Sequence, residues 1–76
     1  MTTTKVFLKE INDVKDFVNI LMRFGYDIEL VSGKYVVDAK SIMGIFSLDL
    51  SRPIELRANT EDAEDLFAAI EKYIVK

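Results

Sequence analysis

The chain has 76 residues, a net charge of −3 and neither cysteine nor histidine, so it has no disulfide, thiolate metal site, cysteine nucleophile or phosphohistidine. Its length predicts one small domain over residues 1–76, and its acidic balance disfavours nucleic acid as the main partner. No apolar run approaches the roughly 18 residues of a membrane span and the first residues lack a signal-peptide core, so we expect a cytoplasmic protein.

The first half of the chain predicts a strand, a helix and two more strands. Thr3–Lys9 alternates in polarity as a strand does. Asn12 is expected to cap a helix that Gly25 ends. Two strands follow at Tyr26–Val31 and Lys34–Ala39, joined by a tight turn. The helix has an apolar stripe at helical spacing, made of Val14, Phe17, Val18 and Leu21 and widened by Ile20, Met22 and Phe24.

A short helix is expected at Ser41–Leu48, because a serine is a favoured N-cap. At 3.6 residues per turn this helix has two apolar faces, although a surface helix needs only one. Either both faces are buried, or the second face is an exposed patch for a partner. One face holds Ile45 and Leu48, and the other holds Ile42, Met43 and Phe46.

The second half continues with a loop at Asp49–Pro53, a strictly alternating strand at Ile54–Ala58 and a helix capped by Asn59 or Thr60. The helix has an acidic start at Glu61, Asp62, Glu64 and Asp65, a buried stripe at Ala63, Leu66, Phe67, Ile70 and Ile74, and Lys72 and Lys76 near its end. The order β-α-β-β-α-β-α predicts an α+β two-layer sandwich, with three helices on one face of a four-stranded antiparallel sheet.

The segment Lys40-Ser41-Ile42-Met43-Gly44-Ile45-Phe46-Ser47-Leu48 resembles the regulatory-serine segment of the HPr family, the small phosphocarriers of the bacterial sugar phosphotransferase system. The element order and length are similar to those of the HPr open-faced sandwich, so the likeness covers nearly the whole chain. It implies that Ser41 is the serine that a dedicated kinase phosphorylates. It also implies a partner-binding set of Lys40, Ser41, Ile42, Met43, Phe46 and Ser47.

The start of the first helix departs from the family. Glu10 stands at the position of the phosphohistidine and Asn12 at that of an arginine, and Asp13 and Asp16 add negative charge. The chain is therefore similar to the catabolite-repression HPr-like proteins, which lack the histidine, keep the serine and act as corepressors of a transcription regulator. The likeness implies a non-catalytic regulator without metal or cofactor. Its implied partners are an HPr-type serine kinase and a transcription regulator or phosphotransferase component. We expect a monomer or weak dimer.

Other interpretations remain open at this point. The chain could be a small-ligand-binding or self-association module of α+β form, and Ser41 could be an unmodified helix cap. An enzyme would have to rely on Glu10 with Asp13, or on the acidic residues at 61–65, which are typical of solvated helix starts. Tyr26, Tyr35 and Tyr73 are expected to be structural, with their hydroxyls in water.

Overall fold

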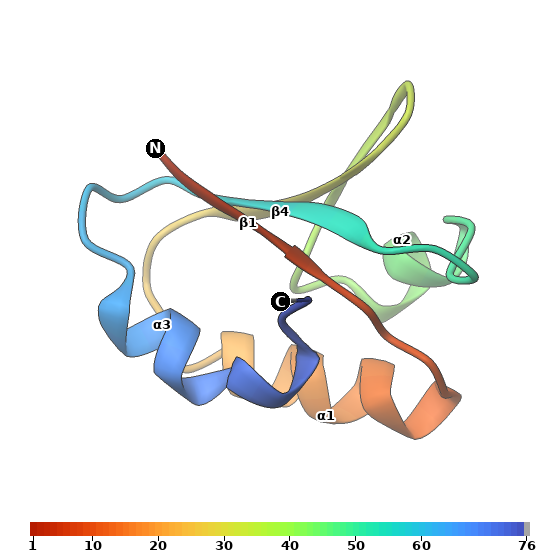
Figure 1. Ribbon diagram of the computed structural model, residues 1–76, viewed down its shortest axis with the longest axis horizontal. Helices are drawn as coiled ribbons and strands as arrows, with labels where there is room; N and C mark the ends of the chain where they lie inside the picture. Colours follow the sequence, from red (N-terminus) through yellow and green to blue (C-terminus); the bar gives the residue numbers. More distant parts are fainter. Residues whose placement is uncertain (76) are drawn as a thin grey trace.

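A four-stranded antiparallel sheet with helices on one side makes up residues 1–75, the part of the chain that the computed structural model describes (Figure 1). The strands lie side by side in the order β1-β4-β2-β3. The predicted α+β architecture is confirmed, and Lys76 lies outside the described residues. The elements are β1 (Thr2–Val6), α1 (Ile11–Leu21), β2 (Ile28–Ser32), β3 (Tyr35–Asp38), α2 (Ile42–Phe46), β4 (Ile54–Ala58), α3 (Glu64–Ala69) and a 3₁₀ turn, η1 (Glu71–Tyr73).

Strand β4 lies between β1 and β2 and carries the clearest alternation of the sheet. Ile54, Leu56 and Ala58 are buried toward the helices, whereas Glu55 and Arg57 lie on the opposite face. Both the bounds and the inward face predicted for this strand are confirmed. Because β4 pairs on both sides, it joins β1 to the hairpin formed by β2 and β3.

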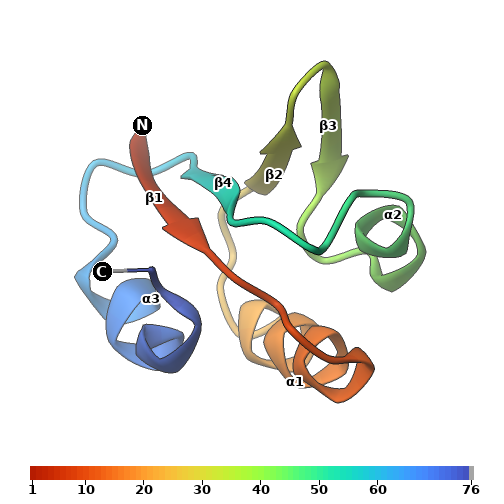
Figure 2. The same cartoon turned by 45° about the vertical axis from the view of Figure 1, so that its right-hand side comes forward.

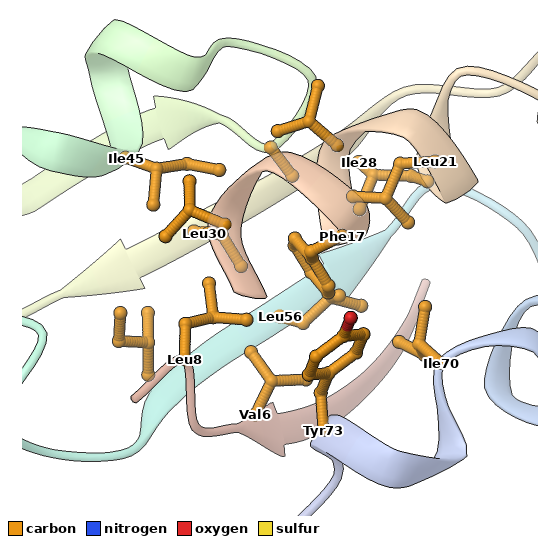
Figure 3. Close-up of a cluster of buried hydrophobic side chains, with 14 of the residues drawn as sticks. Val6, Leu8, Phe17, Leu21, Ile28, Leu30, Ile45, Leu56, Ile70 and Tyr73 are labelled. Atoms are coloured by element: carbon orange, nitrogen blue, oxygen red, sulfur yellow. The ribbon is translucent and has the colours of Figure 1, made fainter. Parts of the chain in front are cut away.

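The core fills the space between the sheet and the helices α1 and α3, which lie side by side beneath it (Figures 1 and 2). Phe17 from α1 is fully buried, and its ring meets Tyr73 of η1 edge-on at 5.6 Å between centroids (Figure 3). The buried cluster consists of Val6, Leu8, Val14, Phe17, Val18, Leu21, Ile28, Leu30, Ala39, Ile45, Leu48, Ile54, Leu56, Ala58, Ala63, Leu66, Ile70 and Tyr73.

Helix α1 differs from its prediction at both ends. Its cap is Glu10, not Asn12, and the Glu10 N–H donates to Asp13 Oδ2 at 3.1 Å. A carboxylate in the third helical position reaches back to the cap, so the start of the helix does not depend on Asn12. The helix ends at Leu21 instead of continuing to Gly25, and Gly25 is not in the left-handed region.

Three other elements are shorter than expected. Strand β1 ends at Val6 and not at Lys9, because its pairing with β4 ends at the pair Val6–Ile54. Beyond it, Phe7 N–H donates to Tyr73 O at 2.8 Å. Strand β2 begins at Ile28, two residues after the predicted start. Strand β3 ends one residue before Ala39.

The last helix begins at Glu64, with Ala63 as its cap, and not after Asn59 or Thr60. Polar side chains instead stabilise a turn before it. Thr60 Oγ1 accepts the Asp62 N–H at 3.3 Å, and Asp62 Oδ1 accepts the Glu64 N–H at 3.0 Å. No helix within residues 1–75 has the length and apolar character needed to cross a membrane.

Candidate functional site

Ser41 caps helix α2, as the sequence predicts. Its backbone is extended, with φ −107° and ψ 109°, and its Oγ accepts the Gly44 N–H at 3.1 Å. The backbone also holds the cap in place, because Ser41 N–H donates to Asp38 O and Ile45 N–H donates to Ser41 O, both at 3.0 Å. The residue is half-buried, and the hydrogen bond to Gly44 N–H holds its hydroxyl in one orientation.

Gly44 lets α2 approach strand β3 closely. A Cβ at this position would lie 3.2 Å from Ser41 Oγ and 3.3 Å from Val37 Cβ. Both distances are tight, so the absence of a side chain allows the helix to pack on β3 and allows Ser41 to reach the Gly44 N–H. The glycine within the serine segment is therefore explained by packing.

The two apolar faces of α2 have different environments. Ile45 is fully buried and Leu48 is 7% exposed, so they attach the helix to the core. The other face, which we call the α2 patch, consists of Ile42, Met43 and Phe46, exposed by 36%, 79% and 38%. The expectation of an exposed second face is confirmed, and the alternative of two buried faces is wrong.

Lys40 and Ser47 make contacts that the sequence does not predict. The Lys40 ammonium donates to Phe24 O at 2.6 Å and to Tyr26 O at 3.0 Å, so it fastens the start of α2 to the segment that follows α1. Ser47 Oγ donates to Gly44 O at 2.6 Å. Lys40 therefore has a structural role, and its predicted part in partner binding stays a prediction, as does that of Ser47.

Glu10 is exposed at the start of α1, and no basic side chain lies in the first turn of that helix. Asp13 is bound to the Glu10 N–H, and Asp16 is exposed. Asn12 is also exposed. This end of α1 therefore presents carboxylates to solvent.

The other candidate groups do not assemble into a pocket. Glu61, Asp62, Glu64 and Asp65 are all exposed, and within residues 1–75 no group of three or more acidic side chains is arranged to hold a metal ion.

The three tyrosines differ in their surroundings. Tyr35 is 70% exposed, whereas Tyr26 is half-buried, and burial together with Asp65 and Asp62 raises the pKa of Tyr26 above its usual value. The prediction for Tyr73 is wrong in one respect, because its hydroxyl lies in the core and not in water.

Two apolar residues at the ends of α1 are exposed, and the prediction that Met22 widens the apolar stripe is wrong. Ile11 and Met22 are 64% and 65% exposed, although each lies at a helical spacing from a buried residue of the stripe. Helical spacing alone could not reveal this, because it does not say how far the neighbouring elements cover each side chain.

Comparisons with known proteins agree with the fold. The family model described as "PTS HPr component phosphorylation site" matches residues 12–76, a range that begins after Glu10. A crystal structure titled HPr-C-His, from Thermoanaerobacter tengcongensis, superposes with a TM-score of 0.78 at 28% identity, covering 95% of this chain and 89% of that one. The chain belongs to the HPr family of the sugar phosphotransferase system.

Proposed function

We propose that this protein is a non-catalytic regulatory member of the HPr family, acting through phosphorylation of Ser41 and protein binding at the α2 patch. One observation carries the proposal: a half-buried serine that caps a helix lies next to an exposed apolar face of that helix, whose other face is buried. The buried face alone would suffice to hold α2, so the exposed face calls for another explanation.

The proposal includes the loss of phosphohistidine transfer. The chain has no histidine, so no imidazole is present to form a phosphohistidine. At the family position of that histidine, Glu10 is an exposed carboxylate beside Asp13, which would repel an incoming phosphoryl group. Both features support a protein that keeps the HPr fold for another purpose.

Phosphorylation of Ser41 would change the charge of an uncharged surface. The helix α2 contains no ionisable residue, and a phosphoserine carries about −1.5 to −2 charge at neutral pH. Because Ser41 lies one residue before Ile42, that charge would lie at the edge of the α2 patch. A partner could then distinguish the two forms by electrostatics, without any change in the fold.

The first experiment is intact-mass analysis after incubation with ATP and an HPr-type serine kinase. We expect a gain of roughly 80 Da, one phosphoryl group. Ser41→Ala should abolish the gain. Ser51→Ala is the matched control, because it removes an exposed serine hydroxyl outside the predicted partner-binding set, and it should leave the gain in place. If the kinase phosphorylates a known HPr and not this chain, the proposal for Ser41 fails.

The α2 patch is tested with the same kinase as the binding partner. Met43→Glu places a charge on the most exposed residue of the patch and should lower kcat/KM for Ser41 phosphorylation about tenfold. Met22→Glu is the matched control, since Met22 is a similarly exposed methionine directly after α1. Equal rates for the two variants would show that the patch does not bind the kinase.

A further inference from the structure

Strand β3 forms a free edge of the sheet. It pairs with β2 on one side, and no other strand within residues 1–75 pairs with it on the other (Figure 2). At the opposite edge, Val75 N–H donates to Lys5 O at 2.9 Å, so the C-terminal segment covers the end of β1. An uncovered edge presents backbone donors and acceptors that can pair with another strand.

The hydrogen bonds show which backbone groups of β3 face outward. Ala39 N–H donates to Ile28 O at 2.9 Å, so Ala39 faces β2. Backbone direction alternates along an antiparallel strand, and Tyr35 and Val37 therefore face β2 as well. Val36 then directs its N–H and C=O to the free edge, and its side chain is 53% exposed.

The sequence around Val36 is self-complementary in charge. In Lys34-Tyr35-Val36-Val37-Asp38, a cation and an anion lie at equal distances from the central valine. If two copies pair antiparallel with Val36 opposite Val36, then each Lys34 lies opposite an Asp38 of the other copy. The same arrangement pairs Tyr35 with Val37 and leaves no like charges opposite one another.

We propose that two copies of this chain associate edge to edge through β3, in an antiparallel pair centred on Val36 and flanked by two Lys34–Asp38 ion pairs. The symmetry is two-fold, so each copy uses the same residues. The outward N–H and C=O of each Val36 bond to those of its mate, and the two sheets become one continuous sheet.

The geometry predicts a weak dimer. The edge is short, β3 spanning Tyr35–Asp38, and such a contact falls below the roughly 1,200 Å² that marks weak and transient interfaces. Lys34 and Asp38 are both exposed, so their ion pairs contribute mainly to register. The dimer is therefore expected to have a dissociation constant of about 0.1–1 mM.

Sedimentation equilibrium over about 10 μM to 1 mM tests the proposal. The native protein should show a monomer–dimer equilibrium, and the Val36 amide should become more protected from hydrogen exchange as concentration rises. Lys34→Glu places two repulsive pairs in the dimer and should weaken association about tenfold or more. Lys15→Glu makes the same charge change at an exposed lysine of α1 and should leave association unchanged.

Exchanging the charges at positions 34 and 38 between two variants distinguishes this pairing from any other contact. Asp38→Lys should also prevent self-association, yet an equimolar mixture with Lys34→Glu should form a heterodimer, because both cross-strand pairs then attract. Asp38→Lys also removes the hydrogen bond from Lys40 N–H to Asp38 Oδ1. Val36→Lys therefore serves as a second variant, because it leaves this turn undisturbed. It should also abolish the dimer. A native protein that stays monomeric at about 1 mM, or a dimer that Lys34→Glu leaves intact, would overturn the proposal.

Discussion

The hydroxyl of Tyr73 is a polar group that the core leaves unpaired. Its oxygen is buried and has no hydrogen-bond partner within residues 1–75, while its ring packs edge-on against Phe17. A buried hydroxyl without a partner loses its hydration and gains nothing in return. Tyr73→Phe should therefore raise the free energy of unfolding by about 1 kcal/mol, measured by urea denaturation.

The matched control for Tyr73 is Tyr35→Phe, because Tyr35 is 70% exposed and its hydroxyl remains hydrated. That change should alter stability by no more than about 0.5 kcal/mol. A loss of stability in Tyr73→Phe would contradict the unpaired hydroxyl. Tyr73 does lie at helical spacing from the buried Leu66 and Ile70, but spacing does not say how deeply its hydroxyl is buried.

Among the elements, α2 shows which structural features the sequence predicts and which it does not. Ser41 as cap and the opposite faces of Ile45 and Met43 follow from helical period, a local property. The contacts of Lys40 do not, because Phe24 and Tyr26 precede it by 16 and 14 residues. The carbonyls of Phe24 and Tyr26 both face the Lys40 ammonium because of the way α1, β2 and α2 pack together.

The two hydrogen bonds of the Lys40 ammonium predict that the protein loses stability when this charge is removed. Lys40→Met keeps the apolar stem and leaves the carbonyls of Phe24 and Tyr26 without their donor. The side chain is half-buried, so we expect a cost of about 1–2 kcal/mol in the free energy of unfolding. Thermal unfolding of the variant beside Lys9→Met, at an exposed lysine, measures it; equal stability of the two would show that these hydrogen bonds contribute nothing.

The strand and helix ends show where tertiary context overrides local signals. Strand β4 matches its prediction because a central strand, paired on both sides, keeps strict alternation. Helix α3 begins after its predicted start because Thr60 and Asp62 use their side chains in a turn. Serine, threonine and aspartate offer the backbone such bonds as readily as helix caps, and sequence does not say which will form.

At the scale of the whole molecule, the helices of residues 1–75 all lie on one face of the sheet. The predicted fold class depended on this one-sided pattern, whereas strand order and the free edge of β3 depend on pairings between distant segments and could not be predicted. The face of the sheet that packs against the helices should therefore contribute most of the stability. Adjacent residues of β2, Leu30 and Val31, point to opposite faces, and Leu30 is fully buried while Val31 is half-buried.

Truncation of these two neighbours tests how unequally the faces contribute. Leu30→Ala leaves a cavity opposite Leu56 in the centre of the sheet and should cost about 2–5 kcal/mol, a large part of the roughly 5–15 kcal/mol that holds a domain together. Val31→Ala, on the face without helices, should cost about 1 kcal/mol or less. Urea denaturation at low micromolar protein, where the β3 pairing is absent, separates the two. Comparable losses would mean that the open face carries packing of its own, and the one-sided account of stability would then fail.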